Sequence, residues 1–204
     1  QDVIESGWLA HGKYSEKLEK LFCEYTGAKY STTVSNCTAG LHLSCIAAGF
    51  KMGDEVIVPA QTHTATAHAI EYTGATAIFV DVDPLTANII PEEIVKKITP
   101  RTKGVIPVHM AGLPCDMKEL KKLSLKYKFK ILEDASHSLG AFYDKKPVGS
   151  NIYSDITIFS FHAVKIITTG EGGMATTNDS HIYENLRLLR SQGVTRNQKD
   201  FKNK

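Results

Sequence analysis

The order of hydrophobic and polar positions along the chain alternates between two periods. The segment from Ser15 to Tyr25 has the 3.6-residue period of an amphipathic helix. Leu18, Leu21 and Phe22 fall on one of its faces, and Gly27 follows as a stop signal. Between such segments lie short apolar runs rich in β-branched and aromatic residues, which are typical of strands.

Strands and helices are predicted to alternate along the whole chain. The predicted strands are Lys29–Ser35, Glu55–Pro59, Thr76–Val82, Gly104–Met110, Phe129–Leu132, Ile156–Phe161 and Gly173–Thr177. The predicted helices are Ser15–Tyr25, Thr38–Ala48, Thr64–Tyr72, one that opens at Pro91, Met117–Tyr127 behind an Asp116 cap, and Ser180–Ser191. This alternation predicts an α/β sandwich with a mostly parallel sheet.

In such sheets, ligands gather at the carboxyl ends of the strands, so the residues that follow each strand are the candidates for a binding site. The first strand leads into Ser35, Asn36, Cys37 and Thr38, which open a helix. Amides at a helix start can bind a phosphate, and Thr38 can add its hydroxyl. The alternative is plain helix capping by Ser35 or Asn36.

Two further strands end in polar residues. His63 follows the Glu55–Pro59 strand, where it can present its ring to a ligand or cap the next helix. Asp134 ends the strand that begins at Phe129, and His137 follows it. A carboxylate there can accept a protonated cofactor nitrogen, and its alternative use is again a helix cap.

The stretch from Asp155 to Gly173 carries the strongest chemical signal. Its strand contains Ser160, and Lys165 follows the strand's end by four residues. Gly170, Gly172 and Gly173 then allow a turn or a close backbone approach. The pattern delivers one lysine to the sheet edge, where a lysine can serve as a Schiff-base nucleophile.

Composition excludes several function classes. The 204 residues contain 42% hydrophobic and 23% charged residues, and the net charge is +2, too small to indicate nucleic-acid or membrane binding. Four cysteines form no CxxC pair, which favours reduced thiols and a cytoplasmic location over a disulfide framework or a metal site. No apolar run of about 18 residues is present to span a membrane.

Pyridoxal phosphate is the cofactor that these candidate residues suit together. It requires a lysine, a carboxylate opposite its pyridine nitrogen and anchors for its phosphate. Lys165, Asp134, and Thr38 with Ser160 can take those parts in that order. The sequence has no GxGxxG and no Walker lysine motif, so dinucleotide and nucleoside-triphosphate binding have no support.

The chain also resembles the DegT/DnrJ/EryC1/StrS family of pyridoxal-phosphate sugar aminotransferases. The resemblance runs in family order from about Glu5 to Asp179, through ESGWLAHG, VSNCTAGLHL, GDEVIVPAQTHTATAHAI, GATAIFVDVDPLTANI, ITPRTKGVIPVHMAGLPCDM, ILEDASHSLGA and DITIFSFHAVKIITTGEGGMATTND. Two of these stretches, EDASHSLGA and FSFHAVKIITTGEGG, look most like transaminases that aminate a UDP-4-keto-6-deoxy-N-acetylhexosamine.

This resemblance implies a fold, an assembly and an activity. The fold is a three-layer sandwich, the fold-type I large domain with a mostly parallel seven-stranded sheet. Residues 1–204 would be this large domain of a longer enzyme whose small C-terminal domain is absent from the sequence. The enzyme would be a homodimer with a shared active site. It would transfer an amino group from an amino acid, L-glutamate in most of the family, to a nucleotide-linked keto sugar.

The resemblance also implies residue roles. Lys165 would bind the cofactor as a Schiff base and move the proton, Asp134 would pair with the pyridine nitrogen, and His137 would lie near the phenolic oxygen. The remaining roles are phosphate binding by Cys37, Thr38 and Ser160, ring stacking by His63, and substrate contact by Gly7, Trp8, Leu9 and Ala10. Cys37 stands where the family usually has Gly or Ala, and His63 where it has Phe or Trp.

Two alternatives to this aminotransferase compete with it. A cofactor-binding sensor or regulator would keep the fold without the chemistry, but such a module has no need of Lys165. A sugar dehydratase of the same family would carry histidine in place of that lysine. Within the aminotransferases, a perosamine-type or a 3-keto sugar is the alternative substrate.

Overall fold

Seven strands form one sheet in the order β1-β9-β8-β5-β4-β2-β3 in the computed structural model, which describes residues 1–194. These strands are β1 (Tyr30–Val34), β2 (Glu55–Pro59), β3 (Thr76–Val80), β4 (Thr102–Val105), β5 (Lys130–Asp134), β8 (Ile156–Ser160) and β9 (Gly173–Thr177). The α-helices are α1 (Asp2–Glu5), α2 (Lys13–Thr26), α3 (Cys37–Ala47), α4 (Thr64–Glu71), α5 (Pro91–Lys97), α6 (Met117–Tyr127) and α7 (Ser180–Arg190).

Strand directions bring most carboxyl ends to one edge of the sheet. The pairs β5–β8, β4–β5, β2–β4 and β2–β3 are parallel, whereas β9 runs antiparallel to both of its neighbours, β1 and β8. Six strands therefore point the same way, and only β9 points back. The predicted fold, a mostly parallel seven-stranded sheet within an α/β sandwich, is confirmed.

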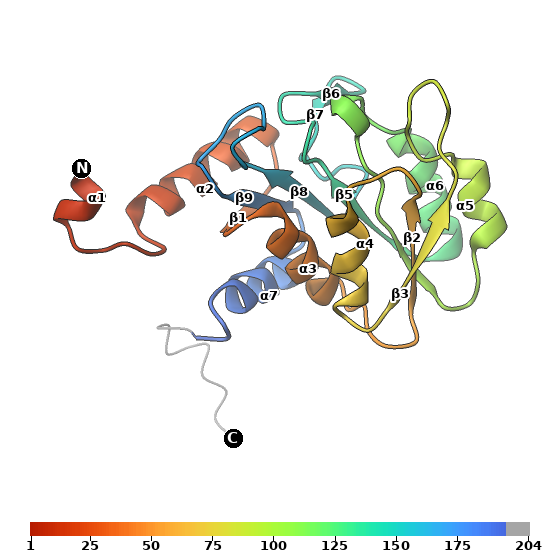
Figure 1. Cartoon of the computed structure of the whole chain (residues 1–204), viewed down its shortest axis with the longest axis horizontal. Helices are drawn as coiled ribbons and strands as arrows, with labels where there is room; N and C mark the ends of the chain where they lie inside the picture. Colours follow the sequence, from red (N-terminus) through yellow and green to blue (C-terminus); the bar gives the residue numbers. More distant parts are fainter. Residues whose placement is uncertain (195–204) are drawn as a thin grey trace.

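Helices cover both faces of the sheet and give the three predicted layers. Residues Leu41 of α3, Ile70 of α4 and Leu186 of α7 share one core with alternate strand residues such as Leu132. On the opposite face, the apolar residues of α5 and α6 pack on Ile131 and its neighbours, and Phe22 of α2 packs on β8. In Figure 1, α3, α4 and α7 lie together across the lower centre, and α5 and α6 lie at the right.

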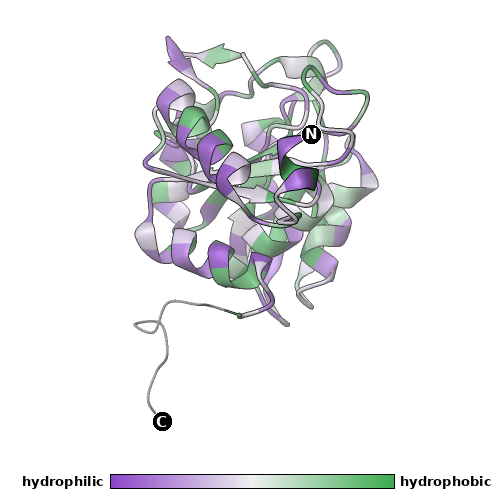
Figure 2. Cartoon of the chain, turned by 90° about the vertical axis from the view of Figure 1, so that its left-hand side faces the viewer, coloured by the Kyte–Doolittle hydropathy of each residue, from purple (hydrophilic) through white to green (hydrophobic). Residues whose placement is uncertain are grey.

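Hydropathy follows this layering. The helices in Figure 2 alternate purple and green along their length, as amphipathic surface helices do. In α6, for example, Leu120 and Leu123 are buried among charged neighbours. The helical periods read from the sequence therefore correspond to real buried faces.

Two glycines let α3 approach the sheet closely. A Cβ on Gly40 would lie 3.0 Å from Val34 and 3.1 Å from Ile158, and one on Gly173 would lie 2.8 Å from the carbonyl oxygen of Phe159. Any larger side chain at Gly173 would push strand and helix apart, since backbone atoms fill the space. The start of α3 is thereby held against the carboxyl ends of β1 and β8.

The structure corrects several predicted boundaries. The strand predicted over Gly104–Met110 is β4, which ends at Val105, because the chain then turns so that the His109 side chain enters the interior and a 3-10 helix (Met110–Gly112) begins. A short hairpin, β6 (Phe142–Tyr143) with β7 (Lys146–Pro147), was not predicted. Residues 195–204 of the predicted domain 1–204 lie outside the described residues.

Candidate active site

Asp134 ends β5 on the face covered by α3 and α4. Strand residues alternate between faces, so Asp134 shares its face with Leu132 of that core. Its side chain accepts a hydrogen bond from Thr66 Oγ1 at 2.8 Å, and two from Ser136, the Oγ at 2.6 Å and the amide at 3.1 Å. No helix follows Asp134 directly, so the helix-cap alternative is excluded and the carboxylate, 4% exposed, is held by hydroxyls.

Lys165 lies in the loop that follows β8, the strand next to β5. This loop folds back on the strand end, because the Phe161 carbonyl accepts bonds from the Thr169 amide and the Thr168 hydroxyl. The Phe161 amide donates to the Gly172 carbonyl and closes the loop's base at 2.9 Å. The predicted placement of a lysine at the sheet edge is found, and the Lys165 side chain is half-buried.

The start of α3 lies at the same edge. Asn36 Oδ1 accepts the Ala39 amide at 2.8 Å, so Asn36, not Ser35, is the cap. The first-turn amides of Cys37 and Thr38 remain outside the helical bonding pattern. The Cys37 thiol lies 3.0 Å from Ser136 Oγ, while Thr38 is exposed.

Two histidines border the same region. His63 caps α4 by accepting the Ala65 amide at Nδ1 (3.1 Å), so the capping alternative is confirmed, and its ring is exposed. Burial, together with the Lys165 ammonium and His63, lowers the pKa of His137, while the negative charge of Asp134 opposes this shift. His137 is therefore a neighbour of both charges, and its imidazole is neutral at pH 7.

The predicted site residues thus fall into two groups. Lys165, Asp134, His137, His63 and Cys37 act on one another electrostatically at the strand ends. Ser160 ends β8 on the same face as Asp134, and its Oγ accepts the His162 amide at 3.4 Å.

Gly7, Trp8, Leu9 and Ala10 form the second group, in an exposed arm between α1 and α2. The arm projects at the left of Figure 1. The Trp8 ring lies against Gly12, at which a Cβ would come within 2.8 Å of it. Within residues 1–194, Gly7, Leu9 and Ala10 form no hydrogen bond with the site residues at the strand ends.

Sequence reasoning missed the hydroxyls that hold Asp134 and a second polar cluster behind it. In the sequence Thr66 has the pattern of an ordinary helix residue. Only its position one helical turn after His63 indicates that it lies near the site. Ser136 could have been found from its position two residues after Asp134, the spacing of an Asx turn. His109 and Glu133 gave no signal, because their contact depends on the turn after β4.

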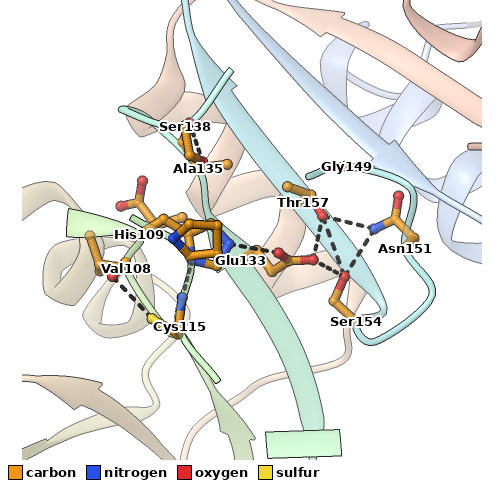
Figure 3. A network of polar contacts seen from close by, with 12 residues as sticks. Val108, His109, Cys115, Glu133, Ala135, Ser138, Gly149, Asn151, Ser154 and Thr157 are labelled. Carbon is orange, nitrogen blue, oxygen red and sulfur yellow. Dashed lines mark hydrogen bonds and ion pairs between the residues drawn. The ribbon is translucent and has the colours of Figure 1, made fainter. Parts of the chain in front are cut away.

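That second cluster surrounds Glu133 on the opposite face of β5 (Figure 3). Glu133 accepts from His109 Nε2 at 2.7 Å, from Thr157 Oγ1 at 2.8 Å and from Ser154. Burial is the largest influence and raises the pKa of Glu133, but these bonds outweigh it and hold that pKa below its usual value. The network is a buried anchor that joins β5 to β8 and to the turn after β4.

The protonation of His109 follows from its two contacts. The Cys115 amide donates to Nδ1 at 3.2 Å, and a ring nitrogen can accept only when it carries no proton. Burial, the largest influence, opposes a charge on the ring, but Cys115 and Glu133 outweigh it and raise the pKa of the imidazole above its usual value. The hydrogen bond from the Cys115 amide nevertheless requires an unprotonated Nδ1, and on that bond we assign the ring proton to Nε2, toward Glu133.

The strand-end donor set fits a phosphate-bearing pyridine ligand. A buried carboxylate, a half-buried amine and free first-turn amides are the three groups that such a ligand needs. Among residues 1–194, no group of three or more His, Cys, Asp or Glu side chains is arranged to hold a metal ion, and no helix is long and apolar enough to cross a bilayer.

Comparisons with known proteins agree with this chemistry. A protein of Methanocaldococcus jannaschii, MJ1066, described as uncharacterized, is 46% identical over 195 residues, which cover 96% of this chain and 50% of MJ1066. Among solved structures, 3-amino-5-hydroxybenzoic acid synthase is 38% identical, with a TM-score of 0.91 over 97% of this chain and 52% of its own.

Two further structures are sugar enzymes by their descriptions. DesI, solved with its TDP-sugar product, is 35% identical, with a TM-score of 0.87 over 94% of this chain and 48% of its own. The PLP form of Spr1654 from Streptococcus pneumoniae, described as a putative sugar aminotransferase, is 34% identical, with a TM-score of 0.87 over 92% of this chain and 53% of its own.

The chain spans about half the length of each of these proteins. Its residues 1–204 match the family model described as the DegT/DnrJ/EryC1/StrS aminotransferase family. The expected family is confirmed, and this chain belongs to the DegT/DnrJ/EryC1/StrS aminotransferase family.

Proposed function

We propose that this chain is the cofactor-binding large domain of a pyridoxal-phosphate aminotransferase that acts on nucleotide-linked keto-deoxysugars. One observation carries the proposal: Asp134 ends β5, Lys165 follows the adjacent parallel strand β8, and both charges act on the pKa of His137. An amine for covalent attachment and a carboxylate for the ring nitrogen are thus brought to one place.

Each residue contributes a definite task. When bound, pyridoxal phosphate supplies an electron sink for the carbon that loses its proton. Lys165 holds the cofactor and then, as general base and acid, moves that proton. The Asp134 carboxylate would accept the pyridine N–H, because a negative partner keeps that nitrogen protonated.

The remaining residues orient the cofactor. The Cys37 and Thr38 amides at the start of α3, with the hydroxyls of Thr38 and Ser160, would bind the phosphate. The Cys37 thiol contacts Ser136, so Cys37 contributes through its backbone. His137 would lie near the phenolic oxygen, and the exposed His63 ring would stack on the cofactor.

The substrate proposal is finer than the family. The sequence around Asp134 and Lys165 favours UDP-4-keto-6-deoxy-N-acetylhexosamine as the substrate. Its keto group would receive the amino group of L-glutamate. DesI, with its TDP-sugar product, supports a nucleotide-linked sugar. Gly7, Trp8, Leu9 and Ala10 would contact this sugar from the exposed arm.

A homodimer with a shared active site completes the proposal. In the loop after β8 that carries Lys165, Val164 is 78% exposed and Ile166 is 64% exposed, and Leu9 of the arm is 74% exposed. Exposed apolar side chains beside the lysine indicate a protein–protein interface, and a second copy of the enzyme would bury them. Sedimentation of the full-length enzyme should show a dimer, and Val164→Ser with Ile166→Ser should weaken it.

Borohydride reduction tests the central assignment. The full-length enzyme is loaded with pyridoxal phosphate, reduced, digested and mapped. We expect the pyridoxyl label on Lys165, and spectral change on adding L-glutamate before reduction. Label on another lysine, or cofactor retained without any lysine adduct, would overturn the function proposed here. A panel of nucleotide keto sugars then identifies the acceptor.

A further inference from the structure

The hydroxyls around Asp134 belong to a longer chain of hydrogen bonds. Thr62 Oγ1 and Thr66 Oγ1 lie 2.8 Å apart, and Thr66 donates to Asp134 Oδ2. On the other side, Cys37 Sγ and Ser136 Oγ lie 3.0 Å apart, and Ser136 donates to Asp134 Oδ1. Asp134 is the common acceptor at the centre of both arms.

The direction of each bond follows from counting protons. A hydroxyl has one proton, and Thr66 and Ser136 each give theirs to the carboxylate. Each must then accept from its outer partner, so Thr62 donates to Thr66 and Cys37 donates to Ser136. Burial, followed by the Asp134 charge, raises the pKa of the Cys37 thiol, which keeps the proton that it must donate.

We propose that Thr66 and Ser136, backed by Thr62 and Cys37, are positioning residues that fix the Asp134 carboxylate for the cofactor nitrogen. This inference rests on the function proposed above. Each carboxylate oxygen is held by a donor from a different element, Thr66 on α4 and Ser136 on the loop after β5. The carboxylate plane is thereby fixed before any ligand arrives, and donors in series strengthen one another.

This assignment explains an unusual residue. Cys37 occupies a buried position at the start of α3, and a thiol is a weak donor. Its task is to complete the bonding of Ser136, which no alanine or glycine at position 37 could do. The thiol is neither a nucleophile nor a phosphate ligand but a fixed proton donor.

The test uses the full-length enzyme freed of cofactor and titrated with pyridoxal phosphate. We compare Ser136→Ala and Thr66→Val with the control Ser138→Ala, whose hydroxyl donates to the Ala135 carbonyl in the same loop (Figure 3). Cys37→Ala is compared with Cys45→Ala, a buried thiol on the same helix. Thermal unfolding of each cofactor-free variant measures structural damage separately.

We expect the dissociation constant for pyridoxal phosphate to rise about 2- to 12-fold for each bond lost to Asp134, with little change in the controls. The absorption of the lysine-bound cofactor should titrate about 0.4 to 1 pH unit higher, because a less well-held pyridine proton withdraws fewer electrons from the attached nitrogen. Cys37→Ser, which keeps a donor, should restore the values that Cys37→Ala loses.

The outcomes separate this inference from the proposed function. If the wild-type enzyme places no cofactor on Lys165, the proposed function fails and the inference falls with it. If the wild type binds normally but Ser136→Ala and Thr66→Val match Ser138→Ala, the inference alone is overturned. If Ser136→Ala does not fold, the Cys37→Ala and Cys37→Ser pair decides, and equal behaviour of those two refutes the donor chain.

Discussion

Glu133 and Asp134 are consecutive carboxylates at the end of one strand, and they have opposite surroundings. Both are buried, at 5% and 4% exposure, so burial does not distinguish them. Alternation along β5 sends Glu133 to the face of α2, α5 and α6, and Asp134 to the face of α3 and α4. Glu133 is hydrogen-bonded to His109 in a sealed interior, whereas Asp134 shares its region with Lys165 and His137.

The comparison separates a carboxylate that anchors the fold from the one that we propose binds the cofactor. Glu133 links the turn after β4 to β8 through His109 and Thr157, so its bonds hold the chain on both sides of β5 in place. Asp134 is bound by residues that lie at the strand ends, where the lysine loop and the start of α3 also converge. Removing Glu133 should therefore damage the fold, and removing Asp134 the chemistry.

The largest effect is expected at the lysine on the Asp134 side. Lys165→Ala in the full-length enzyme should abolish both half-reactions, because no other group there is placed to hold the cofactor and move the proton. The Glu133 network is untouched, so thermal unfolding of the cofactor-free enzyme should stay as in the wild type. Single-turnover absorption with L-glutamate and with the keto sugar measures the two halves. Substantial turnover in either half would refute the role of Lys165.

Asp134→Asn tests the functional carboxylate directly. The amide keeps the shape but not the charge, so the pyridine proton loses its partner and turnover should fall by about 10²- to 10⁴-fold. Cofactor should still bind. Steady-state kinetics of the full-length variant measures the loss, and near-normal turnover would contradict the assignment.

Glu133→Gln should reverse that pattern. The amide cannot accept from all three donors, so the free energy of unfolding should fall by about 3 kcal/mol, while turnover per folded molecule changes little. Urea unfolding of the full-length variant, followed by activity of the refolded fraction, measures both. A loss of turnover without a loss of stability would show that Glu133 acts in catalysis and not in holding the fold.

The same variant carries a pH signature. The pKa of Glu133 is lower in the folded than in the unfolded chain, so its contribution is present above the unfolded pKa and is lost as pH falls through the folded pKa. In wild type, stability should therefore fall below about pH 4.5. Glu133→Gln should flatten this acid limb. An unchanged slope would show that Glu133 is not held by these bonds.

The sequence predicted the candidate cofactor-binding residues better than the residues that form hydrogen bonds with them. The placement of Asp134 and Lys165 at strand ends could be predicted because strand ends are set by local periodicity, which a single sequence displays. Thr66 and Ser136 were missed because their partner is fixed by the packing of α4 and by the loop after β5. Glu133 was missed for the same reason, since its contact with His109 requires the chain to leave β4 at Val105.

The smallest effect is expected at His63, on the rim of the Asp134 region. His63 caps α4 through Nδ1, and its exposed ring is placed to cover the cofactor. His63→Phe keeps a flat ring and loses the cap, at a cost of about 1 kcal/mol in stability, but should keep substantial activity. His63→Ala loses both and should bind pyridoxal phosphate more weakly. His63→Asn, which restores the cap without the ring, is the matched control and should bind as weakly as His63→Ala. If His63→Phe lowers turnover as much as His63→Ala does, the imidazole takes part in the chemistry, and His63 is then a catalytic residue of the Asp134 site.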